Sequence, residues 1–136
     1  MFEILEHTAD IGFRARGATA RELFENAALA LVSIAVEAGG IEAKHPYPIA
    51  VNGEDRASLL VNWLSEVLYW LDGCRVALGR FEVDEITEGR VVGKGYGEPR
   101  DSSKHPPKLV VKGVTYHQLK VGQDSEGWFA EVYLDI

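Results

Sequence analysis

The sequence predicts an α+β fold in which two amphipathic helices pack on an antiparallel β-sheet. Two helical patterns lie in the first half of the chain, and from Val76 onward the apolar residues recur with a period of two. The turns between the later strands are too short for helical crossovers, which favours antiparallel strands over a βαβ array. A chain of 136 residues that is 46% hydrophobic is long enough to bury the core of a single domain, residues 1–136.

The chain opens with two short strand-like stretches, Phe2–Leu5 and Gly12–Arg16. Within the second stretch Phe13 and Ala15 alternate with two arginines, which is typical of a strand with one buried face. We expect a turn from His7 to Asp10 to join the two stretches into an antiparallel hairpin.

Two helices are predicted next. Thr19 followed by Glu22 forms a capping-box pattern at the start of the first helix, which continues until Gly39. Asp55 is the expected cap of the second helix, Arg56–Leu71. The apolar stripe of this second helix, which we expect to face the core, consists of Leu60, Trp63, Leu64, Val67, Leu68 and Leu71.

The other predicted elements are strands with alternating apolar residues. They are Tyr47–Val51, Phe81–Val83, Val91–Tyr96, Leu109–Val114, Gln118–Val121 and Trp128–Leu134. The segment Gly97–Lys108 contains three prolines and a serine pair, so it is expected to form a loop. Gly93, Gly95 and Gly97 have no helix behind them to bind a phosphate, and they indicate bulges or close backbone approach.

Charge and composition exclude several classes of function. The formal net charge is −7, and the 14 Lys and Arg residues are scattered singly, so direct binding of nucleic acid is not expected. Cys74 is the only cysteine, which excludes an internal disulfide and a cysteine-based zinc site. The chain shows neither a secretory signal nor an apolar run of membrane-spanning length. We therefore expect a soluble protein of the cytoplasm.

Oxygen-rich groups gather at the two ends of the chain. Asp135 and Ile136 close the alternating run WFAEVYLDI, so a carboxylate side chain stands next to the terminal carboxylate. Asp10 is a further acid near the other end, in the expected hairpin turn. If folding brings these groups together, they offer the hard ligands that a divalent cation prefers. The alternative for Asp10 is the ordinary role of aspartate in a turn, which is to accept main-chain N–H bonds.

The histidines and one lysine are further candidates for chemistry. His7, His45, His105 and His117 lack the spacing of a helix-borne zinc motif. A metal-dependent hydrolase that uses Asp10 and Asp135, with His7 or His117 as the base, is one alternative. Lys112 lies in a largely apolar strand-like run, where a lysine ordinarily faces solvent.

Four segments together resemble the archease family. They are EHTADIGF at 6–13, YGEPRDSSKHP at 96–106, KGVTYHQLKV at 112–121 and the closing YLDI. The resemblance extends over the whole chain in the same order. Gly113 and Gln118 depart from the commoner residues of the third motif, but neither is a presumed ligand.

The resemblance implies a non-catalytic protein with two helices against antiparallel sheet. Members of this family activate the GTP-dependent RNA ligase of tRNA splicing by promoting its guanylylation and multiple turnover. Asp10, Asp135 and Ile136 match the family's ligands for a divalent cation, assigned there as Ca²⁺, with Mg²⁺ or Mn²⁺ as alternatives. Lys112 matches a lysine that matters for activation, and His7 and His117 are further candidates for a part in partner activation. We therefore expect an acidic tip that meets the active site of the ligase.

The family is also associated with a second role. This role is that of a chaperone-like modulator of a tRNA methyltransferase, and it implies a different protein partner. Binding to partners from a cell extract separates the two expectations.

Overall fold

The computed structural model describes residues 1–6 and 10–136 as a chain of strands interrupted by two helices. The elements are β1 (Phe2–Glu6), β2 (Asp10–Gly17), α1 (Ala20–Ala35), the 3₁₀ turn η1 (Ala38–Gly40), β3 (His45–Asn52), α2 (Arg56–Leu68), the π-helical turn η2 (Tyr69–Gly73), β4 (Val76–Ile86), β5 (Arg90–Pro99), β6 (Gly113–Asp124) and β7 (Gly127–Asp135).

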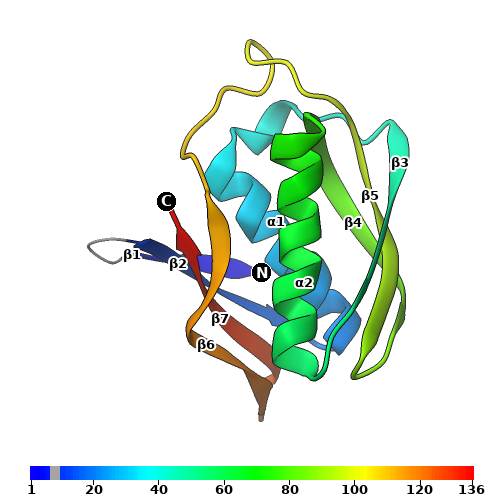
Figure 1. Cartoon of the computed structure of the whole chain (residues 1–136), viewed down its shortest axis with the longest axis vertical. Coiled ribbons are helices and arrows are strands. Elements are labelled where there is room, and N and C mark those ends of the chain that lie inside the picture. The colour runs from blue at the N-terminus through cyan, green and yellow to red at the C-terminus, as the bar shows by residue number, and fades with distance from the viewer. Residues whose placement is uncertain (7–9) are drawn as a thin grey trace.

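The strands form two antiparallel sheets, one on each side of the helix pair (Figure 1). The first sheet has the order β1-β2-β7-β6 and the second has the order β3-β5-β4. Helix α1 contacts β2 and β4, and α2 contacts β6 and β3, so each helix touches both sheets. The predicted α+β class with two helices and antiparallel strands is confirmed, with the strands divided between two sheets.

Both helices begin where the sequence predicts. The Thr19 hydroxyl accepts a hydrogen bond from the Glu22 N–H at 3.2 Å at the start of α1. At the start of α2, the Asp55 carboxylate accepts from the Ser58 N–H at 2.8 Å, and the Ser58 hydroxyl accepts in return from the Asp55 N–H. These bonds satisfy N–H groups that have no partner within the helix.

The second helix ends differently from the prediction of Arg56–Leu71. Its α-helical part stops at Leu68, and the chain continues through η2, which closes with a bond from the Cys74 N–H to the Tyr69 carbonyl at 2.9 Å. The predicted apolar stripe is nevertheless in place. Trp63 is fully buried, and its indole N–H donates to the Phe24 carbonyl at 3.0 Å, which joins α2 to α1.

The predicted loop and the strand after it are shifted. Strand β5 continues through Gly97 to Pro99. Strand β6 begins only at Gly113, so residues 109–112 lie outside it. Gly97 belongs to the strand because it pairs with His45 of β3 and Leu78 of β4, and a Cβ at this position would overlap the carbonyl oxygen of Ala77 on β4. The expectation of close backbone approach at the glycines is therefore confirmed for Gly97, whereas the prediction that it starts a loop was wrong.

Replacing Gly97 with alanine tests this close approach. Gly97→Ala must push β4 and β5 apart, so we expect it to lower the free energy of unfolding by about 1–3 kcal/mol. Urea denaturation measures the change. Gly113→Ala is the matched control, because a Cβ there meets nothing within 4 Å. Equal stability of the two variants would contradict the close packing of β5 on β4.

Candidate functional site at the ends of the chain

The two aspartates singled out in the sequence lie opposite each other on adjacent strands. β2 and β7 pair antiparallel, and Asp10 is the register partner of Asp135. Directly opposite residues of an antiparallel pair share a face of the sheet, with Cβ atoms about 4.5–5.5 Å apart. Asp10 is half-buried and Asp135 is exposed, so both carboxylates are placed at one accessible end of the sheet.

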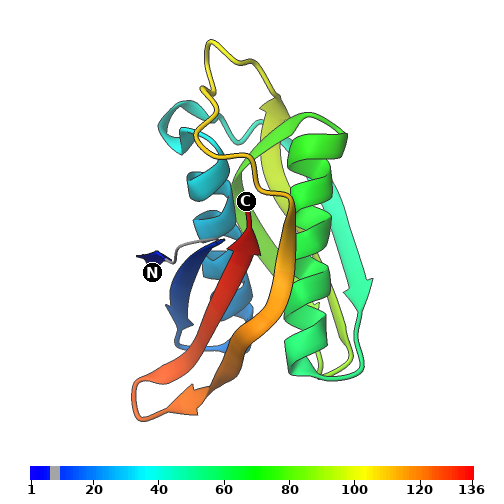
Figure 2. The same ribbon diagram turned by 60° about the vertical axis from the view of Figure 1, so that its left-hand side comes forward.

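Asp10 is not in the turn where the sequence placed it. It is the first residue of β2, because β7 extends as far as Asp135 and provides a pairing partner. In Figure 2 the end of β7 lies beside the start of β6, so a third segment reaches the same end of the sheet.

This third segment carries Lys112. The Lys112 N–H donates to the carbonyl of Asp135 at 2.7 Å, and the next residue, Gly113, is the register partner of Asp135. Lys112 therefore lies just before β6 and not inside a strand, which corrects the prediction, and its side chain is exposed. We call Asp10, Lys112, Asp135 and Ile136 the terminal cluster.

Of the two candidate histidines, the structure describes only His117, which is not part of this cluster. His7 lies outside the described residues. His117 is exposed, in the part of β6 where the pairing register with β7 is interrupted between Thr115 and Lys120. Its ring packs edge-on against Tyr133, with the ring centroids 6.4 Å apart. Tyr133 is two residues before Asp135 and lies on the same face of β7. His117 therefore contacts a residue that shares this face with Asp135.

The donor groups of the terminal cluster suit a hard cation in kind, although they are few. Ca²⁺ takes six to eight oxygen ligands, and carboxylates and main-chain carbonyls are typical ones. Within residues 1–6 and 10–136, no group of three or more His, Cys, Asp or Glu side chains is placed to hold a metal ion. Two opposed carboxylates and the end of the chain would therefore need water or a partner protein to complete a coordination shell.

Two arginines of β2 are already paired with other acids. The Arg14 guanidinium bonds Glu131 and Glu3, and Arg16 bonds Asp124 at 3.0 Å. The hydrogen bond from Arg14 lowers the pKa of Glu131. Because these arginines are held elsewhere, they leave the negative charge of Asp10 and Asp135 available to an added cation.

A buried hydrogen-bonded pair that sequence reasoning did not identify lies under the loop before Lys112. Glu98 is 6% exposed and His105 is fully buried, and their Oε2 and Nε2 atoms are 2.9 Å apart. The Asp101 N–H donates to Nδ1 of His105, so the Nε2–H of the ring is the donor to Glu98. The motif GEP…HP contains both residues, but nothing in their spacing indicated that they meet.

Further hydrogen bonds hold this carboxylate in its charged form. Glu98 accepts from the Glu42 N–H at 3.0 Å and from the Lys104 ammonium at 2.9 Å. The bond from the Glu42 N–H, followed by that from Lys104, lowers the pKa of Glu98 from 4.5 to about 2. The role of His105 in the structure is thus to fasten a loop.

The loop is also tied to the end of α1 by main-chain bonds. The Glu37 N–H donates to the Pro106 carbonyl, and the Lys108 N–H donates to the Ala35 carbonyl, both at 2.9 Å. Lys112 follows Lys108 by four residues, and its N–H donates to the Asp135 carbonyl. The Glu98–His105 pair and the α1 bonds therefore define the path by which this lysine reaches the terminal cluster.

Comparison with known proteins agrees with the resemblance found in the four motifs. The model of the Archease protein family matches residues 2–136. The chain belongs to the archease family. A protein archease from Pyrococcus furiosus is 44% identical over 139 residues, which cover 99% of this chain and 98% of the relative. One from Methanosarcina acetivorans is 38% identical, with 99% of this chain and 95% of the relative covered.

Solved archease structures have the same fold. The solution structure of Methanobacterium thermoautotrophicum protein 1598 matches with a TM-score of 0.81 and 33% identity, covering 99% of this chain and 98% of that one. The crystal structure of an archease from Thermotoga maritima, described as a possible chaperone, matches with a TM-score of 0.60 and 23% identity over 97% and 94% of the two chains, a likeness of fold. No helix in the described part of this archease is long and apolar enough to cross a membrane.

The buried carboxylate predicts a defined dependence of stability on pH. A carboxyl whose pKa is lower in the folded protein stabilises the fold above its unfolded pKa, and this contribution is lost as the pH falls through the folded pKa. For Glu98 the loss occurs between about pH 4.5 and pH 2. We expect Glu98→Gln to be much less stable than the wild type at pH 7, with the difference shrinking toward pH 2.

Urea unfolding of both proteins at about pH 7 and about pH 2.5 measures this difference. Glu88→Gln, in the exposed turn between β4 and β5, controls for the loss of one carboxylate elsewhere. A difference between wild type and Glu98→Gln that is the same at both pH values would show that the charge of Glu98 does not stabilise the loop.

Proposed function

We propose that this archease is a non-catalytic activator of the GTP-dependent RNA ligase of tRNA splicing, and that it acts by presenting its terminal cluster to the active site of the ligase. The observation that supports the proposal most directly is the pairing of Asp10 with Asp135 on adjacent strands. This pairing supplies an accessible acidic tip, which family membership alone does not require. In this proposal the ligase catalyses the reaction, and the archease promotes guanylylation of the ligase and its repeated turnover.

In this proposal a divalent cation is held by Asp10, Asp135 and the carboxylate of Ile136. Ca²⁺ is the leading candidate, because its variable coordination tolerates an open site, whereas Mg²⁺ demands near-ideal octahedral geometry. Mn²⁺ is the other alternative. Asp10 and Asp135 would supply negative charge to the cation, and further ligands would have to come from elsewhere. Oxygen atoms of the ligase, of GTP or of water would be suitable as these further ligands.

Lys112 has a separate task in the proposal. Its main chain is bonded to Asp135, so the root of its side chain is fixed relative to the two acids. A lysine ammonium is a mobile point charge that binds phosphate groups well. We assign Lys112 the role of contacting phosphate oxygens of GTP in the ligase site, while the acids face the cation.

The overall charge supports a protein partner in preference to RNA. With a net charge of −7, the archease is repelled by a phosphate backbone and attracted by the basic surface of an RNA-binding enzyme. Complementary potentials accelerate the encounter of two proteins and favour one orientation.

A chaperone-like role toward a tRNA methyltransferase is the second candidate. The description of the Thermotoga maritima relative as a possible chaperone favours it, as do exposed apolar side chains such as Val110 and Tyr116. Capture of the methyltransferase but not of the ligase by the purified protein would support this role over ligase activation.

Removing either carboxylate of the tip tests the main proposal. We expect Asp10→Asn and Asp135→Asn each to reduce stimulation of ligase guanylylation by at least about tenfold, because loss of groups that support a metal costs about 10- to 100-fold. Single-turnover formation of the guanylylated ligase is the measurement. Glu126→Gln, in the turn at the opposite end of the same sheet, is the control. Unchanged stimulation by both aspartate variants would exclude the acidic tip from the mechanism.

Moving the terminal carboxylate provides an independent test. One glycine added after Ile136 shifts this carboxylate by one residue, a distance of up to about 3.8 Å, and leaves both aspartates in place. We expect stimulation to fall together with the affinity for Ca²⁺, as measured by calorimetry. Ile136→Leu keeps the chain length and should behave as the wild type. Full activity of the extended protein would remove Ile136 from the ligand set.

A further inference from the structure

The exposed side of α2 and η2 carries a stripe of side chains that do not take part in the core. Asn62, Ser65, Tyr69 and Asp72 follow one another at intervals of three and four residues, and all four are exposed. This spacing places them on one face of the helix. In Figure 1 helix α2 lies between β6 and β3, the outer strands of the two sheets.

Grooves run along both sides of the stripe. A groove of about 500 Å³ separates Ser65, Tyr69 and Asp72 from the segment Val110–Gly113, and one of about 480 Å³ separates the helix from Ala50–Asn52 of β3. A third, of about 600 Å³, lies at the start of α2 and is lined by Asn62 and Tyr116. We call the stripe and its three grooves the α2 face.

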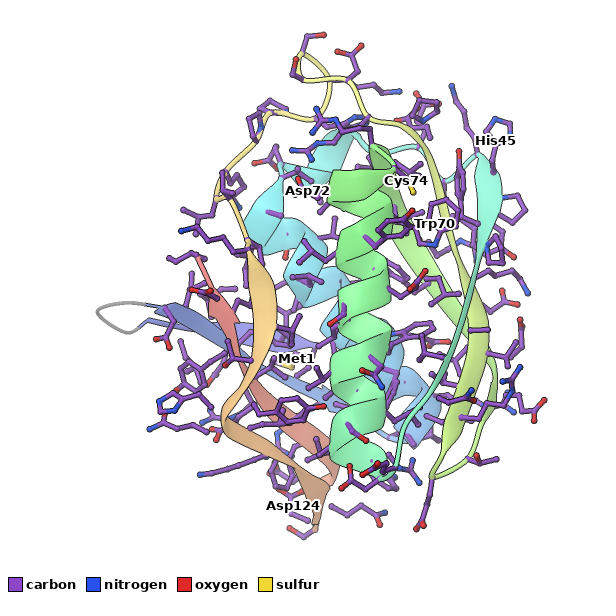
Figure 3. The ribbon with its side chains drawn as sticks, in the orientation of Figure 1. Met1, His45, Trp70, Asp72, Cys74 and Asp124 are labelled. Atoms are coloured by element: carbon purple, nitrogen blue, oxygen red, sulfur yellow. The ribbon has the colours of Figure 1, made fainter. Side chains whose placement is uncertain are left out.

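The positions of two labelled side chains agree with this arrangement. Figure 3 shows Asp72 on the side of the helix toward the segment that leads into β6, and Trp70 on the side toward β3. The Trp70 indole N–H donates to the Pro48 carbonyl at 3.1 Å, which attaches β3 to the helix end. The first groove therefore lies beside Asp72, whereas on the other side of the helix end β3 is held by the bond to Trp70.

The composition of the α2 face is typical of a protein interface. Tyr69 is 58% exposed, Tyr116 is 59% exposed and Val110 is 73% exposed, and small uncharged residues such as Ser65 lie between them. Exposed aromatic residues together with few charges distinguish the centre of interfaces from the ordinary surface. Tyr69 also lies in a π-helical turn, a feature that is frequent at functional sites.

Charge indicates which partner fits this face. The charged residues that line the three grooves are Glu54, Glu66, Asp72 and Lys112, three acids and one base. A second copy of the chain would bring like charges together, and nucleic acid would be repelled in the same way. A protein surface with a basic rim around an apolar centre is complementary.

The geometry of the flanking strands limits how such a partner binds. β3 carries Pro46 and Pro48, which cannot donate main-chain hydrogen bonds, and β6 is irregular around Gln118, whose φ is 54°. Edges of this kind do not accept an added strand. The partner therefore packs side chains into the grooves.

The first groove is continuous with the terminal cluster. Lys112 and Gly113 line it, and both are joined to Asp135, the first by a main-chain hydrogen bond and the second by strand pairing. We propose that the α2 face is the docking surface for a basic protein surface next to a phosphate-binding active site. This assignment rests on the proposed function, in which the basic surface belongs to the RNA ligase. Binding of the ligase to the α2 face then places the terminal cluster at the active site of the ligase.

A charge placed at the centre of the stripe tests the proposal. Ser65 is exposed, so Ser65→Arg and Ser65→Glu should both fold, as circular dichroism verifies. Against a basic partner we expect Ser65→Arg to raise the Kd for the purified ligase at least about tenfold, because like charges are strongly unfavourable in an interface. Ser65→Glu should bind more tightly than Ser65→Arg. Ser125→Arg, in the exposed β6–β7 turn, is the matched control and should bind as the wild type.

Calorimetric titration, paired with the guanylylation assay, separates the two ways in which the proposal can fail. Equal Kd values for Ser65→Arg, Ser125→Arg and the wild type would overturn the α2 face while leaving ligase activation intact. Equal weakening by the arginine and glutamate variants would overturn the basic character of the partner. If the wild type neither binds nor stimulates the ligase, the proposed function fails, and the assignment of the ligase to this face fails with it.

Discussion

The register between β2 and β7 determines where every group of the terminal cluster lies. Phe13 on β2 is opposite Val132 on β7, and both are fully buried. A slip of one residue would turn these side chains to solvent, and burying each such side chain contributes about 1.5–3 kcal/mol. The core therefore enforces the pairing of Asp10 with Asp135, without any attraction between the acids themselves. The position of the polar tip follows from apolar residues a few positions away on the same strands.

The loop before β6 adds a second constraint, of a different kind. The path of residues 100–112 is not determined by strand pairing but by the buried Glu98–His105 bond and by main-chain bonds to the end of α1. A buried carboxylate is costly unless it is fully hydrogen-bonded, and here both oxygens of Glu98 have donors. The polar pair therefore specifies one loop path, and that path ends at Lys112.

The elements predicted correctly from the sequence are those whose information is local. The caps at Thr19 and Asp55 and the strand at Trp128–Leu134 depend on neighbours within a few residues, and all three are confirmed, although Tyr133 on the expected outer face of that strand is buried. The end of β5 at Pro99 depends instead on the approach of the Ala77 carbonyl from another strand. The apolar run before Lys112 has a strand-like composition, yet residues 109–112 precede β6 because the loop, and not a neighbouring strand, sets their path.

Long-range contacts also decided which candidate residues meet. The meeting of Asp10 and Asp135 was predictable from the alternation of β7 and the position of the chain ends, although the strand position of Asp10 was not. His105 was indistinguishable from the other histidines in the sequence, since its partner Glu98 is identified only by the folded path of the loop. The division of the strands into two sheets was also not predictable from the sequence, because each helix contacts both sheets.

Under the proposed function, an incomplete ligand set would be an advantage, because an activator must release its partner. Two carboxylates and a chain end leave most positions of a six- to eight-coordinate cation unfilled, so such a site gains affinity only where another molecule supplies further oxygens. Binding of the cation and of the partner are then coupled, and by linkage each strengthens the other by the same factor. If the α2 face is the docking surface, as proposed, it would supply the orientation that such a weak site lacks. Selectivity would then come from the α2 face, while the cation is bound firmly only once the partner's active site has been reached.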